Sequence, residues 1–540
     1  MNRKEQYKRF SSIPKFDLCI IGGGATGAGI ALDATLRGLK VLLIDKYDFA
    51  GQTSSKSTKL IHGGVRYLEQ AIKKLDKEQF FMVKKSLYER ETLIKNAPHL
   101  TSKLALLTPC YSWWEGFYLT VGLKMYERIS GKTSIGASKW LSKKEALKLI
   151  PDLRKEKLKS GVLYYDGQLD DARYCLAIIQ KAEELGAIVL NYAEAISFTK
   201  DEKTNHLNSL NVRDRIDNKT FNIKADVFIN ATGPFADHIR QMANPALEKR
   251  IKVSRGAHII LSSDVMKSET AMLIPKTDDG RVLFIIPWQS SLLVATTDEE
   301  DTLSEFPKLE KNEIPYLLNH VNRYLDKTVT PEDIKGSFAG QRPLLQKSKT
   351  SSDTKSLVRD HEIEVDNTTN LVSIMGGKWT NYRLMAKDTL DHIYETIWKK
   401  PTPICTTDNQ LLYGAENYQF DDWRILVATY DISEKTARHL MKKYGSKAIE
   451  VLKLTVNDPS LKKQLSKEHP FIKAEIVYAI KEEMATNSND ILERRLGLSL
   501  RDEKAANAVT ELVNSLFMKY QEDLKIVSEI YNADSATSSK

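Results

Sequence analysis

The segment from residue 16 to 45 constrains the fold of this 540-residue chain more than any other part of the sequence. An apolar run stops there at a cluster of glycines, a stretch of small residues with helical spacing follows, and a second apolar run ends in Asp45. Gly22, Gly24 and Gly27 have the spacing G-x-G-x-x-G. The order strand, tight turn, helix, strand is typical of the opening of a dinucleotide-binding fold.

Each glycine of this turn has a separate physical task. The first permits the sharp turn, the second lets a pyrophosphate approach the backbone, and the third lets helix and strand pack closely. The helix N-terminus offers free N–H groups and a partial positive charge to phosphates, and the acid at the end of the second strand is placed to accept hydrogen bonds from an adenosine ribose. The pattern does not by itself distinguish a nicotinamide from a flavin cofactor. The candidate cofactor-binding residues of this unit are Gly22, Gly24, Ala25, Thr26, Gly27 and Asp45.

Composition bounds the class of protein. The chain is long enough for two or more domains, and 41% hydrophobic with 28% charged residues is typical of a globular protein. The net charge of +9 would suit nucleic acid, an anionic membrane surface or an anionic substrate, although a well-solvated surface explains it equally. The four cysteines are scattered without a C-x-x-C pair, so we expect neither a metal site nor a disulfide framework, and a reducing cytoplasm fits best. The basic N-terminus lacks the apolar core of a secretory signal, and no run of eighteen apolar residues predicts a membrane-spanning helix.

A loop rich in hydroxyl groups follows Asp45. Hydroxyls and glycines give hydrogen bonds without bulk, so this stretch suits a loop laid along a cofactor, and a polar surface loop is the alternative. The loop contributes Thr53, Ser54, Ser55 and Ser57, and the basic and aromatic residues His62, Arg66 and Tyr67 come after it.

A second nucleotide signal lies far along the chain, in residues 225–237. A buried strand leads there into Ala231, Thr232 and Gly233. In a nicotinamide dehydrogenase the cofactor fold would be contiguous, whereas here the sheet is completed after a long insertion. That interleaving is characteristic of proteins that bind flavin adenine dinucleotide (FAD). The next segment, 251–334, reads as antiparallel strands that form the floor of a substrate pocket, and it contains His258.

A third block supplies further basic residues. Arg342 and Arg359 precede a buried strand, a Gly-Gly turn at Gly376 and Gly377, and a helix that we expect to start near Lys378 to Thr380. Such a helix N-terminus can direct its dipole at the negative charge that develops on a reduced flavin. Arg66, Arg359 and Lys378 come from three separate loops, so they can converge on one anion, although scattered arginines often pair with surface carboxylates.

Three other segments carry expectations. Residues 111–132 combine aromatic side chains with lysines, as an interfacial membrane helix does, and a helix in the core or at a subunit contact is equally consistent. Asp170, Asp171 and Arg173 are expected to hold a turn together as internal ion pairs. Arg494 and Arg495 are expected to form surface ion pairs rather than to face the catalytic part of the chain.

The predicted fold is an α/β FAD-binding Rossmann-type domain of the glutathione-reductase kind, interleaved with an antiparallel-sheet substrate domain and followed by an all-α domain. Residues 1–398 form the oxidoreductase region, residues 399–419 a linker, residues 420–533 the helical domain and residues 534–540 a flexible tail. The predicted FAD-binding segments are residues 15–110, 160–250 and 335–398, and the predicted substrate-domain segments are residues 111–159 and 251–334.

Eight stretches, in this order, resemble the family of FAD-dependent glycerol-3-phosphate dehydrogenases. They are IIGGGATGAGIALDATLRGL, SSKSTKLIHGGVRYLE, NAPHL, DDARY, NATGP, IPW followed by TTD, GQRPLL and GGKWTNYR. The resemblance runs from about residue 15 to 395, and DILERRLGLSLRDEKAA near the C-terminus resembles the helical domain of the same family.

This resemblance implies oxidation of sn-glycerol 3-phosphate at C2 to dihydroxyacetone phosphate, with hydride transfer to N5 of FAD. The substrate phosphate would be held by the basic and hydroxyl groups, and the catalytic side chains would lie near the reacting carbon, with His258 favoured over His62 as the base and Arg342 steadying the oxyanion. The implied substrate-binding residues are Arg66, Tyr67, Arg359, Lys378 and Thr380, and the implied catalytic residues are His258, His62 and Arg342. The implied cofactor-binding residues are the glycine-turn set above together with Thr53, Ser54, Ser55, Ser57, Ala231, Thr232, Gly233, Gly376 and Gly377.

The electron acceptor implied by the family is membrane quinone, and one branch of it uses oxygen and releases hydrogen peroxide. A quinone-linked enzyme is expected to be cytoplasmic and peripheral on the inner face of the cell membrane, and a homodimer is possible. An FAD-dependent amine oxidase is an alternative that would need no cluster of basic residues for a phosphate. A flavoprotein that binds nucleic acid is disfavoured, because the chain lacks an RNA-reading motif and its lysines are spread among acids.

Overall fold

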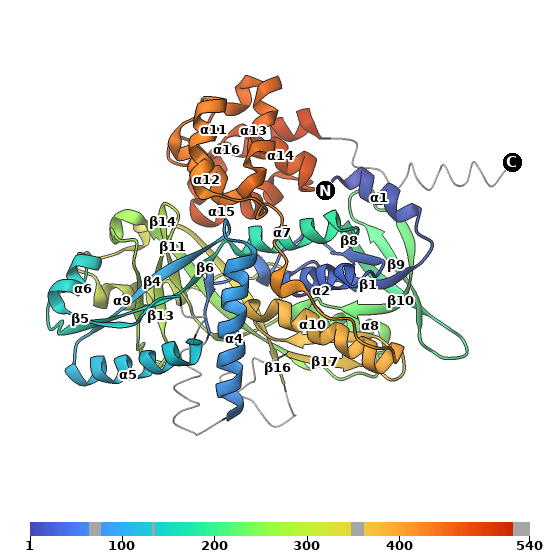
Figure 1. The fold of residues 1–540 in the computed structure, drawn as a ribbon, viewed down its shortest axis with the longest axis horizontal. Helices are drawn as coiled ribbons and strands as arrows, with labels where there is room; N and C mark the ends of the chain where they lie inside the picture. Colours follow the sequence, from blue (N-terminus) through green and yellow to red (C-terminus); the bar gives the residue numbers. More distant parts are fainter. Residues whose placement is uncertain (64–76, 132–134, 347–360, 522–540) are drawn as a thin grey trace.

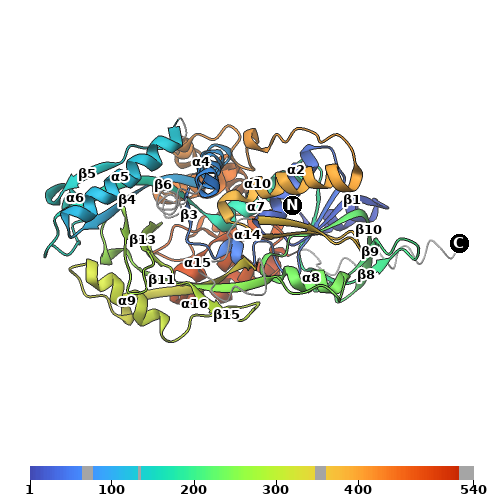
Figure 2. The same ribbon diagram turned by 90° about the horizontal axis from the view of Figure 1, so that it is seen from below.

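The computed structural model describes residues 1–63, 77–131, 135–346 and 361–521. Two large sheets lie side by side, and a helical unit, orange to red in Figure 1, lies above the middle of the molecule. Seen from below, the first sheet lies to the right and the second to the left (Figure 2). The predicted class, α/β with an all-α C-terminal unit, is confirmed, and the sheets are mixed rather than purely parallel or antiparallel.

The first sheet is the Rossmann-type sheet that the glycine turn predicts. Its central strands are parallel, β17 pairs antiparallel with β18 at one edge, and β8 and β9 extend β10 as antiparallel strands. In spatial order it contains β17 (His361–Val365), β18 (Val372–Gly376), β10 (Thr220–Asn230), β1 (Phe16–Ile21), β2 (Val41–Ile44) and β7 (Ile188–Leu190), with β8 (Ala193–Lys200) and β9 (Leu207–Asp214) attached.

Helices cover both faces of this sheet. Apolar side chains of α2 (Ala25–Leu36), α7 (Asp171–Glu184) and α10 (Tyr382–His392) form one core with the strands, and α1 (Arg3–Ser11) and α8 (Ala236–Ala243) form another core on the opposite face. The near-continuous apolar sequences of β1 and β2 follow from this, since a strand covered on both faces has no wet side.

The second sheet is antiparallel except where β12 runs parallel to β4. In spatial order it contains β15 (Glu299–Asp301), β11 (Ile251–Ser262), β14 (Ser291–Ala295), β13 (Leu283–Trp288), β12 (Ala271–Ile274), β4 (Thr101–Cys110), β6 (Ser160–Leu169) and β3 (Leu60–Ile61), while β16 (Ile334–Leu345) pairs with β11 and β5 (Lys139–Ser142) with β6. The helices beside it are α4 (Lys77–Asn96), α5 (Trp113–Ser130), α6 (Lys143–Leu149) and α9 (Glu313–Tyr324).

The strand pairing differs from the predicted segment boundaries. The predicted cofactor segments are residues 15–110, 160–250 and 335–398, but β3, β4, β6 and most of β16, which lie in these segments, pair within the second sheet. Local sequence shows that a segment is a strand, whereas the sheet it joins is decided by long-range pairing.

The C-terminal unit is a helical bundle around its own apolar core, as the period of its apolar residues predicts. It contains α11 (Trp423–Tyr430), α12 (Glu434–Tyr444), α13 (Ala448–Asn457), α14 (Lys473–Glu482), η13 (Asp490–Arg495), α15 (Leu498–Arg501) and α16 (Glu503–Tyr520). The predicted tail at residues 534–540 lies outside the described residues. The short helical turns of the bundle are η10 (Phe420–Asp422), η11 (Gly445–Lys447) and η12 (Pro459–Lys462). Short turns in the rest of the described chain include η1 (Thr53–Ser55), η3 (Gly233–Phe235), η4 (Ser263–Val265), η5 (Pro331–Asp333), η7 (Trp379–Asn381), η8 (Ile393–Trp398) and η9 (Thr407–Asn409).

Two predictions about charged clusters are wrong. Asp170, Asp171 and Arg173 do not form ion pairs with one another: Asp171 pairs with Lys59, and Arg173 pairs with Glu483 of the C-terminal unit. Arg494 and Arg495 are buried against Asp48 rather than placed at the surface. Arg494 also pairs with the nearby Asp490 and Glu493. The partners Lys59, Glu483 and Asp48, however, are more than a hundred residues away, so the sequence near each cluster gives no sign of them.

Candidate active site

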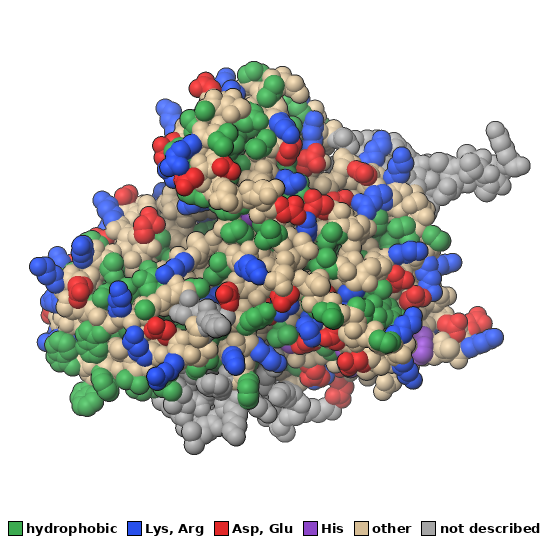
Figure 3. Space-filling model, in the orientation of Figure 1, with side chains coloured by type: hydrophobic (Ala, Val, Ile, Leu, Met, Phe, Trp, Pro, Cys, Tyr) green, Lys and Arg blue, Asp and Glu red, His purple; other side chains and the backbone are tan. Residues whose placement is uncertain are grey.

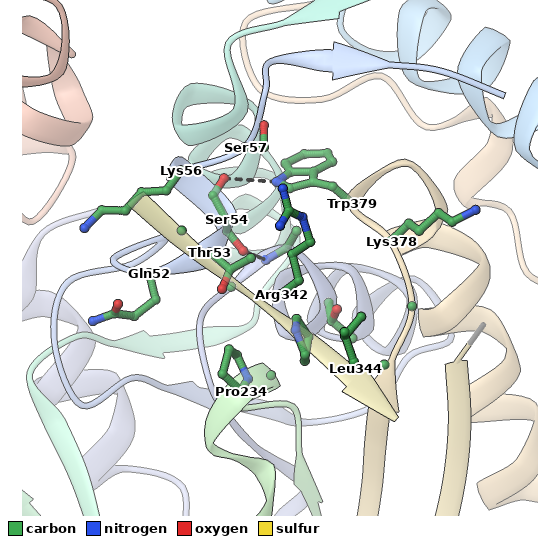
Figure 4. Close-up of a pocket in the computed structure, with 18 of the residues that line it drawn as sticks. Gln52, Thr53, Ser54, Lys56, Ser57, Pro234, Arg342, Leu344, Lys378 and Trp379 are labelled. Carbon is green, nitrogen blue, oxygen red and sulfur yellow. Dashed lines mark hydrogen bonds between the residues drawn. The ribbon is translucent and has the colours of Figure 1, made fainter. Parts of the chain in front are cut away.

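A cavity of about 1490 Å³ lies between the two sheets and reaches from the glycine turn after β1 to the inner surface of the second sheet. Its volume exceeds the range of about 300–1,000 Å³ of an ordinary small-molecule pocket, so it has room for a dinucleotide and a small substrate together. Figure 4 shows that its wall combines side chains from the hydroxyl loop, β16 and η7.

The glycine turn leaves no space for larger residues. Gly22 has a φ of +112°, in the left-handed region, and a Cβ there would lie 2.6 Å from the carbonyl oxygen of Ala231. A Cβ on Gly27 would lie 1.9 Å from the carbonyl oxygen of Gly22. The helix α2 therefore begins directly against the strand, and Gly24, Ala25 and the helix start face the cavity.

Asp45 at the end of β2 lines the cavity and also fixes the glycine turn. One carboxylate oxygen accepts the N–H of Gly23 at 2.7 Å, and the other accepts the N–H of Tyr47 at 2.9 Å. Burial raises the pKa of Asp45 to about 6, although these backbone N–H groups act to lower it. Each oxygen keeps a further lone pair, so the side chain can still accept a ribose hydroxyl.

The hydroxyl loop is bound to elements on both sides of the cavity. Ser54 Oγ accepts the N–H of Ala25 at 3.0 Å, and its carbonyl accepts the indole N–H of Trp379 at 3.0 Å, the bond drawn in Figure 4. Thr53 Oγ1 donates to the carbonyl of Gln341 on β16 at 2.6 Å. Thr53, Ser54 and Ser57 line the cavity, whereas Ser55 is fully buried beside it and does not.

The two later glycine-containing turns reach the same cavity. Thr26, Ala231, Thr232 and Gly233 line it beside the glycine turn, because β10 lies next to β1 in the sheet. Gly376 and Gly377, with φ of +73° and +80°, follow β18, which pairs with β10. Segments separated by about 350 residues in the sequence thus meet at the carboxyl ends of adjacent parallel strands.

His258 lies on β11 and is 2% exposed. Its Nε2 is 3.2 Å from Thr58 Oγ1, and its ring stacks on Phe338 with centroids 4.5 Å apart. Burial, followed by the positive charges of Arg342 and Lys59, lowers the pKa of His258 well below its usual value. The imidazole is therefore neutral at physiological pH, and a neutral imidazole can accept a proton.

Arg342 lies on β16, and its guanidinium is held in place by four acceptors. One terminal nitrogen is 3.2 Å from Asp298 Oδ1 and 3.4 Å from Ser254 Oγ, and the other is 3.1 Å from Thr296 Oγ1 and 3.1 Å from the carbonyl of Thr297. The cavity-lining guanidinium is thus a fixed positive charge.

The register of β11 and β16 brings these two side chains to one face of the sheet. His258 is directly opposite Phe338, and Ser254 is directly opposite Arg342. Cross-strand partners and residues two apart share a face of an antiparallel sheet, so His258 and Arg342 share one. The pair between them is Gly256 opposite Gly340, and the guanidinium of Arg342 occupies the room beside Gly256, since a Cβ there would lie 2.3 Å from a terminal nitrogen.

The predicted phosphate-binding residues are only partly described. Lys378 and Thr380 line the cavity at η7, and Figure 4 shows the amine of Lys378 extending away from Arg342. A short 3₁₀ turn at Trp379–Asn381 precedes α10, so the regular helix starts slightly later than expected. His62 is exposed and also lines the cavity. Arg66, Tyr67 and Arg359 lie outside the described residues.

Several residues of the site were missed by sequence reasoning. Thr58, Asp298, Thr296 and Trp379 make the contacts that hold His258, Arg342 and Ser54. Each of these residues lies within one of the stretches that carry the family resemblance. A motif in the sequence does not show which other side chain each of its residues contacts.

The residues present fit FAD. A dinucleotide needs a close backbone approach at the glycine turn, free N–H groups at the start of a helix, an acidic residue at the end of β2 and a second turn for the flavin end. The cavity provides each of these within one continuous space.

The four cysteines are free thiols, and three of them are buried.

Comparison with protein families gives two matches. The model described as FAD dependent oxidoreductase matches residues 17–390, and the model described as the C-terminal domain of alpha-glycerophosphate oxidase matches residues 405–522.

Curated relatives and solved structures agree with these matches. A probable mitochondrial glycerol-3-phosphate dehydrogenase of Caenorhabditis elegans is 41% identical over 94% of this chain and 71% of its own, and the mitochondrial human enzyme of that name is 39% identical over 94% and 70%. The glycerol-3-phosphate dehydrogenase of Bacillus halodurans, solved with FAD, superposes with a TM-score of 0.77 at 27% identity, covering 99% of this chain and 97% of that one. An L-alpha-glycerophosphate oxidase from Mycoplasma pneumoniae, at 19% identity and a TM-score of 0.55 over 73% of this chain and 98% of its own, shares the fold.

Proposed function

Because this chain belongs to the FAD-dependent oxidoreductase family and, within it, to the glycerol-3-phosphate dehydrogenases, we propose that it oxidises sn-glycerol 3-phosphate to dihydroxyacetone phosphate. The observation that carries this proposal is the single cavity that joins the dinucleotide turn to His258, Arg342 and Lys378. A cofactor site, a neutral base and cationic groups for an anionic substrate are what the reaction requires.

FAD, when bound, supplies the acceptor for the hydride that leaves C2 of the substrate. The protein must then accept the proton of the C2 hydroxyl. We assign this task to His258, because burial and the adjacent cations keep its imidazole neutral and ready to accept a proton. The hydrogen-bonding distance to Thr58 and the stacking on Phe338 limit the orientations that the ring can take. His62, the other candidate, also lines the cavity but is exposed, whereas His258 is buried in the wall beside Arg342.

Arg342 would stabilise the negative charge that develops on the C2 oxygen as the carbonyl forms. Its guanidinium stays protonated at neutral pH, so it is unsuited to act as a base. The acceptors Asp298, Thr296 and the Thr297 carbonyl hold it before substrate arrives, so that little reorganisation is needed in the transition state.

The substrate phosphate would be bound at the other side of the cavity. Lys378 and Thr380 at η7 offer a charge and a hydroxyl, and the resemblance assigns Arg66, Tyr67 and Arg359 to the same group. Charge-assisted bonds from several cations suit a phosphate dianion. A K378M variant should therefore raise the dissociation constant for glycerol 3-phosphate more than it lowers the rate of flavin reduction at saturation.

The test is anaerobic mixing of the purified holoprotein with glycerol 3-phosphate while the oxidised flavin absorbance is followed. The wild type should bleach, and glycerol without the phosphate should give a much slower reaction. A flavin band that stays oxidised would refute the proposed reaction. Bleaching by an amine or amino acid instead would favour the amine oxidase alternative.

For the electron acceptor we propose quinone in a membrane, with the protein peripheral on the cytoplasmic face. The support is the outer face of α5, which exposes Trp113, Trp114, Phe117, Tyr118, Val121 and Met125 at 40–80%. Figure 3 shows this group of hydrophobic side chains over α5 at the lower left. Exposed lysine and arginine at 124 and 128 flank it. Wide apolar patches rimmed by charge mark contact sites for membranes or proteins. The exposed face of α5 therefore excludes a core helix and agrees with the other expectations, an interfacial membrane helix or a helix at a subunit contact.

Apolar side chains line part of the cavity near α5. Leu60, Leu119, Leu273 and Phe284 line it, and Leu119 lies on α5 itself. An apolar electron acceptor held at the α5 face would find apolar side chains of the same cavity beside it. None of the helices in the described part of the chain is long and apolar enough to cross a membrane.

Vesicle binding tests the membrane part of the proposal. A W114S/F117S variant should lose cosedimentation with anionic phospholipid vesicles and lose quinone reduction, while anaerobic reduction by substrate stays unchanged. The matched control is I404S/M518S, which removes two apolar side chains that are 87% and 71% exposed away from α5. Equal vesicle binding by both variants and the wild type would refute the assignment.

Oxygen is the second candidate acceptor, because the C-terminal family model is named for alpha-glycerophosphate oxidase. Reoxidation of the substrate-reduced protein by air-saturated buffer or by a soluble quinone, followed at the flavin band, separates the two acceptors. Rapid reoxidation by oxygen with stoichiometric hydrogen peroxide would replace quinone with oxygen in the proposal.

A further inference from the structure

The C-terminal helical unit contacts the cofactor half of the molecule through a buried cluster of charges. Arg494 and Arg495, at the end of η13, are 7% and 1% exposed, and both bind Asp48, which is 1% exposed. Arg494 Nε lies 2.7 Å from Asp48 Oδ2, and the two terminal nitrogens of Arg495 lie 2.5 Å and 2.9 Å from Oδ2 and Oδ1. Asn191 Nδ2 completes the set at 3.2 Å from Oδ1.

The charges of this cluster outweigh the effect of burial. Burial alone raises the pKa of Asp48, but the charges and hydrogen bonds of Arg495 and Arg494 lower it to about 2. The Asp48 carboxylate is therefore ionised near neutral pH, and its charge is compensated by the guanidinium groups of Arg494 and Arg495. Removing one partner of such a pair leaves an uncompensated charge in a buried place.

Asp48 belongs to the loop that fixes the glycine turn. Three residues earlier, the Asp45 carboxylate accepts the N–H of Gly23, and two residues later, the N–H of Ala50 donates to the carbonyl of Gly23 at 3.0 Å. The ring of Phe49 packs against Gly23 so closely that a Cβ there would lie 2.6 Å from it. The loop thus binds both backbone groups of Gly23, and Asp48 lies between the two attachment points.

The same loop forms one wall of the cavity. Residues 45–47 and 51–54 line it on both sides of Asp48, while Asp48 itself faces away from the cavity toward η13. Lys56, a little further along and also cavity-lining, has its amine 3.5 Å from Glu493 of the same helical turn. The C-terminal unit is therefore attached to the rear of the wall that the adenosine part of a dinucleotide would contact.

We propose that the C-terminal unit holds the FAD site in its binding shape, with Asp48, Arg494 and Arg495 as positioning residues for the cofactor. These three residues do not line the cavity. The C-terminal unit acts on FAD indirectly, because it fixes the loop from Asp45 to Ser54 and, through that loop, the glycine turn. This assigns a task to residues 420–521 that neither the glycine motif nor the reaction itself requires. It rests on FAD binding alone and not on the identity of the substrate or the electron acceptor.

The chain offers a matched control at the same interface. Arg173 of α7 is 4% exposed and binds both oxygens of Glu483, which is fully buried in the C-terminal unit, at 2.7 Å and 2.8 Å. Neither residue lines the cavity. Glu483 also contacts Arg495, whose terminal nitrogen donates to the Glu483 carbonyl at 2.6 Å, so the substitution is made at Arg173 and not at Glu483. Loss of the Arg173 guanidinium removes a comparable buried ion pair from the interface while the bonds of Arg494 and Arg495 to Asp48 can persist.

The experiment compares full-length R495M, D48N and R173M holoproteins. The FAD dissociation rate is measured by the rise of flavin fluorescence on dilution, and the FAD dissociation constant by titration after the cofactor has been removed. Global unfolding is followed by circular dichroism in the same buffer. We expect R495M and D48N to weaken FAD binding on the order of 10-fold or more, which corresponds to the loss of one charged hydrogen bond. R173M should lower the melting temperature and leave the FAD dissociation constant within about 2-fold of the wild-type value, far less than the change expected for R495M and D48N.

Two results would overturn the proposal. One is FAD affinity in R495M and D48N equal to that of the wild type. The other is a loss of FAD affinity in all three variants in proportion to the fall in melting temperature, which would show a merely structural interface. If R495M does not fold, the milder R494Q replaces it, since Arg494 makes one bond to Asp48 while Arg495 makes two.

Discussion

Replacing Asp45 by asparagine tests the electrostatics of the glycine turn. The pKa of the Asp45 carboxyl is raised from 3.8 to about 6 by burial. A shift of about two units corresponds to about 3 kcal/mol, and this is an upper value because the side chain is partly open to the cavity. For an acid whose pKa is higher in the folded state, the folded protein is favoured when the group is protonated. Stability contributed by Asp45 is therefore complete below about pH 4 and is lost as the pH rises to about 6.

The amide of D45N does not titrate, so the variant escapes this loss. The stability of D45N minus that of the wild type should become more positive by up to about 3 kcal/mol between pH 4 and pH 7, on top of a constant penalty for one lost acceptor at Gly23 or Tyr47. Urea midpoints and melting temperatures across this range measure the difference, and the exposed Asp226→Asn variant corrects for general loss of charge. A difference that is flat or falls with pH would refute the reasoning, because the backbone N–H groups would then outweigh burial.

Four further outcomes follow from the site. G27A should fail to retain FAD, because its Cβ would lie 1.9 Å from the Gly22 carbonyl oxygen, and flavin absorbance of the purified protein checks this against wild type. H258N should slow anaerobic flavin reduction on the order of 10²–10⁴-fold with FAD content unchanged, and a rate near wild type would transfer the role of base to another group. In wild type the pH profile of that reduction should show no loss attributable to His258 as the pH falls to 6.5, whereas R342M should move its acid limb upward, since Arg342 lowers the pKa of His258. G256A should lower the reduction rate without affecting FAD binding, because its Cβ would lie 2.3 Å from a terminal nitrogen of Arg342.

The cofactor end of the site could be predicted from sequence because its rules are local. A φ of +112° at Gly22 and a Cβ clash at Gly27 are demands of one turn, and each selects glycine within a few residues. The same holds for the turn at Gly376 and Gly377. The place where these turns meet follows from parallel strand order, so the sequence predicts it once the strands are recognised.

The interface between the cofactor-binding region and the C-terminal helical unit could not be predicted, because the residues that pair across it are far apart in the sequence. Asp48 and Arg495 are separated by 447 residues, and Arg173 and Glu483 by 310. A buried arginine and a surface arginine look alike in a sequence with 80 basic residues. Most arginine side chains are exposed, so a surface ion pair is the reasonable expectation for any one arginine. That expectation is wrong where the fold brings two oppositely charged side chains together in a buried place.

The part of the site that contains His258 and Arg342 depends on the register between β11 and β16, and no local pattern in either strand specifies that register. Arg342 and His258 share a face because Ser254 pairs with Arg342 and His258 with Phe338. A slip of one residue would turn the guanidinium to the opposite face and leave the imidazole without it. The apolar residues that alternate with this face, among them Ala257 and Ile259, pack into the core of the second sheet and oppose such a slip. The packing on one side of β11 therefore determines which side chains lie on the other, and Gly256 leaves the room that the guanidinium of Arg342 occupies.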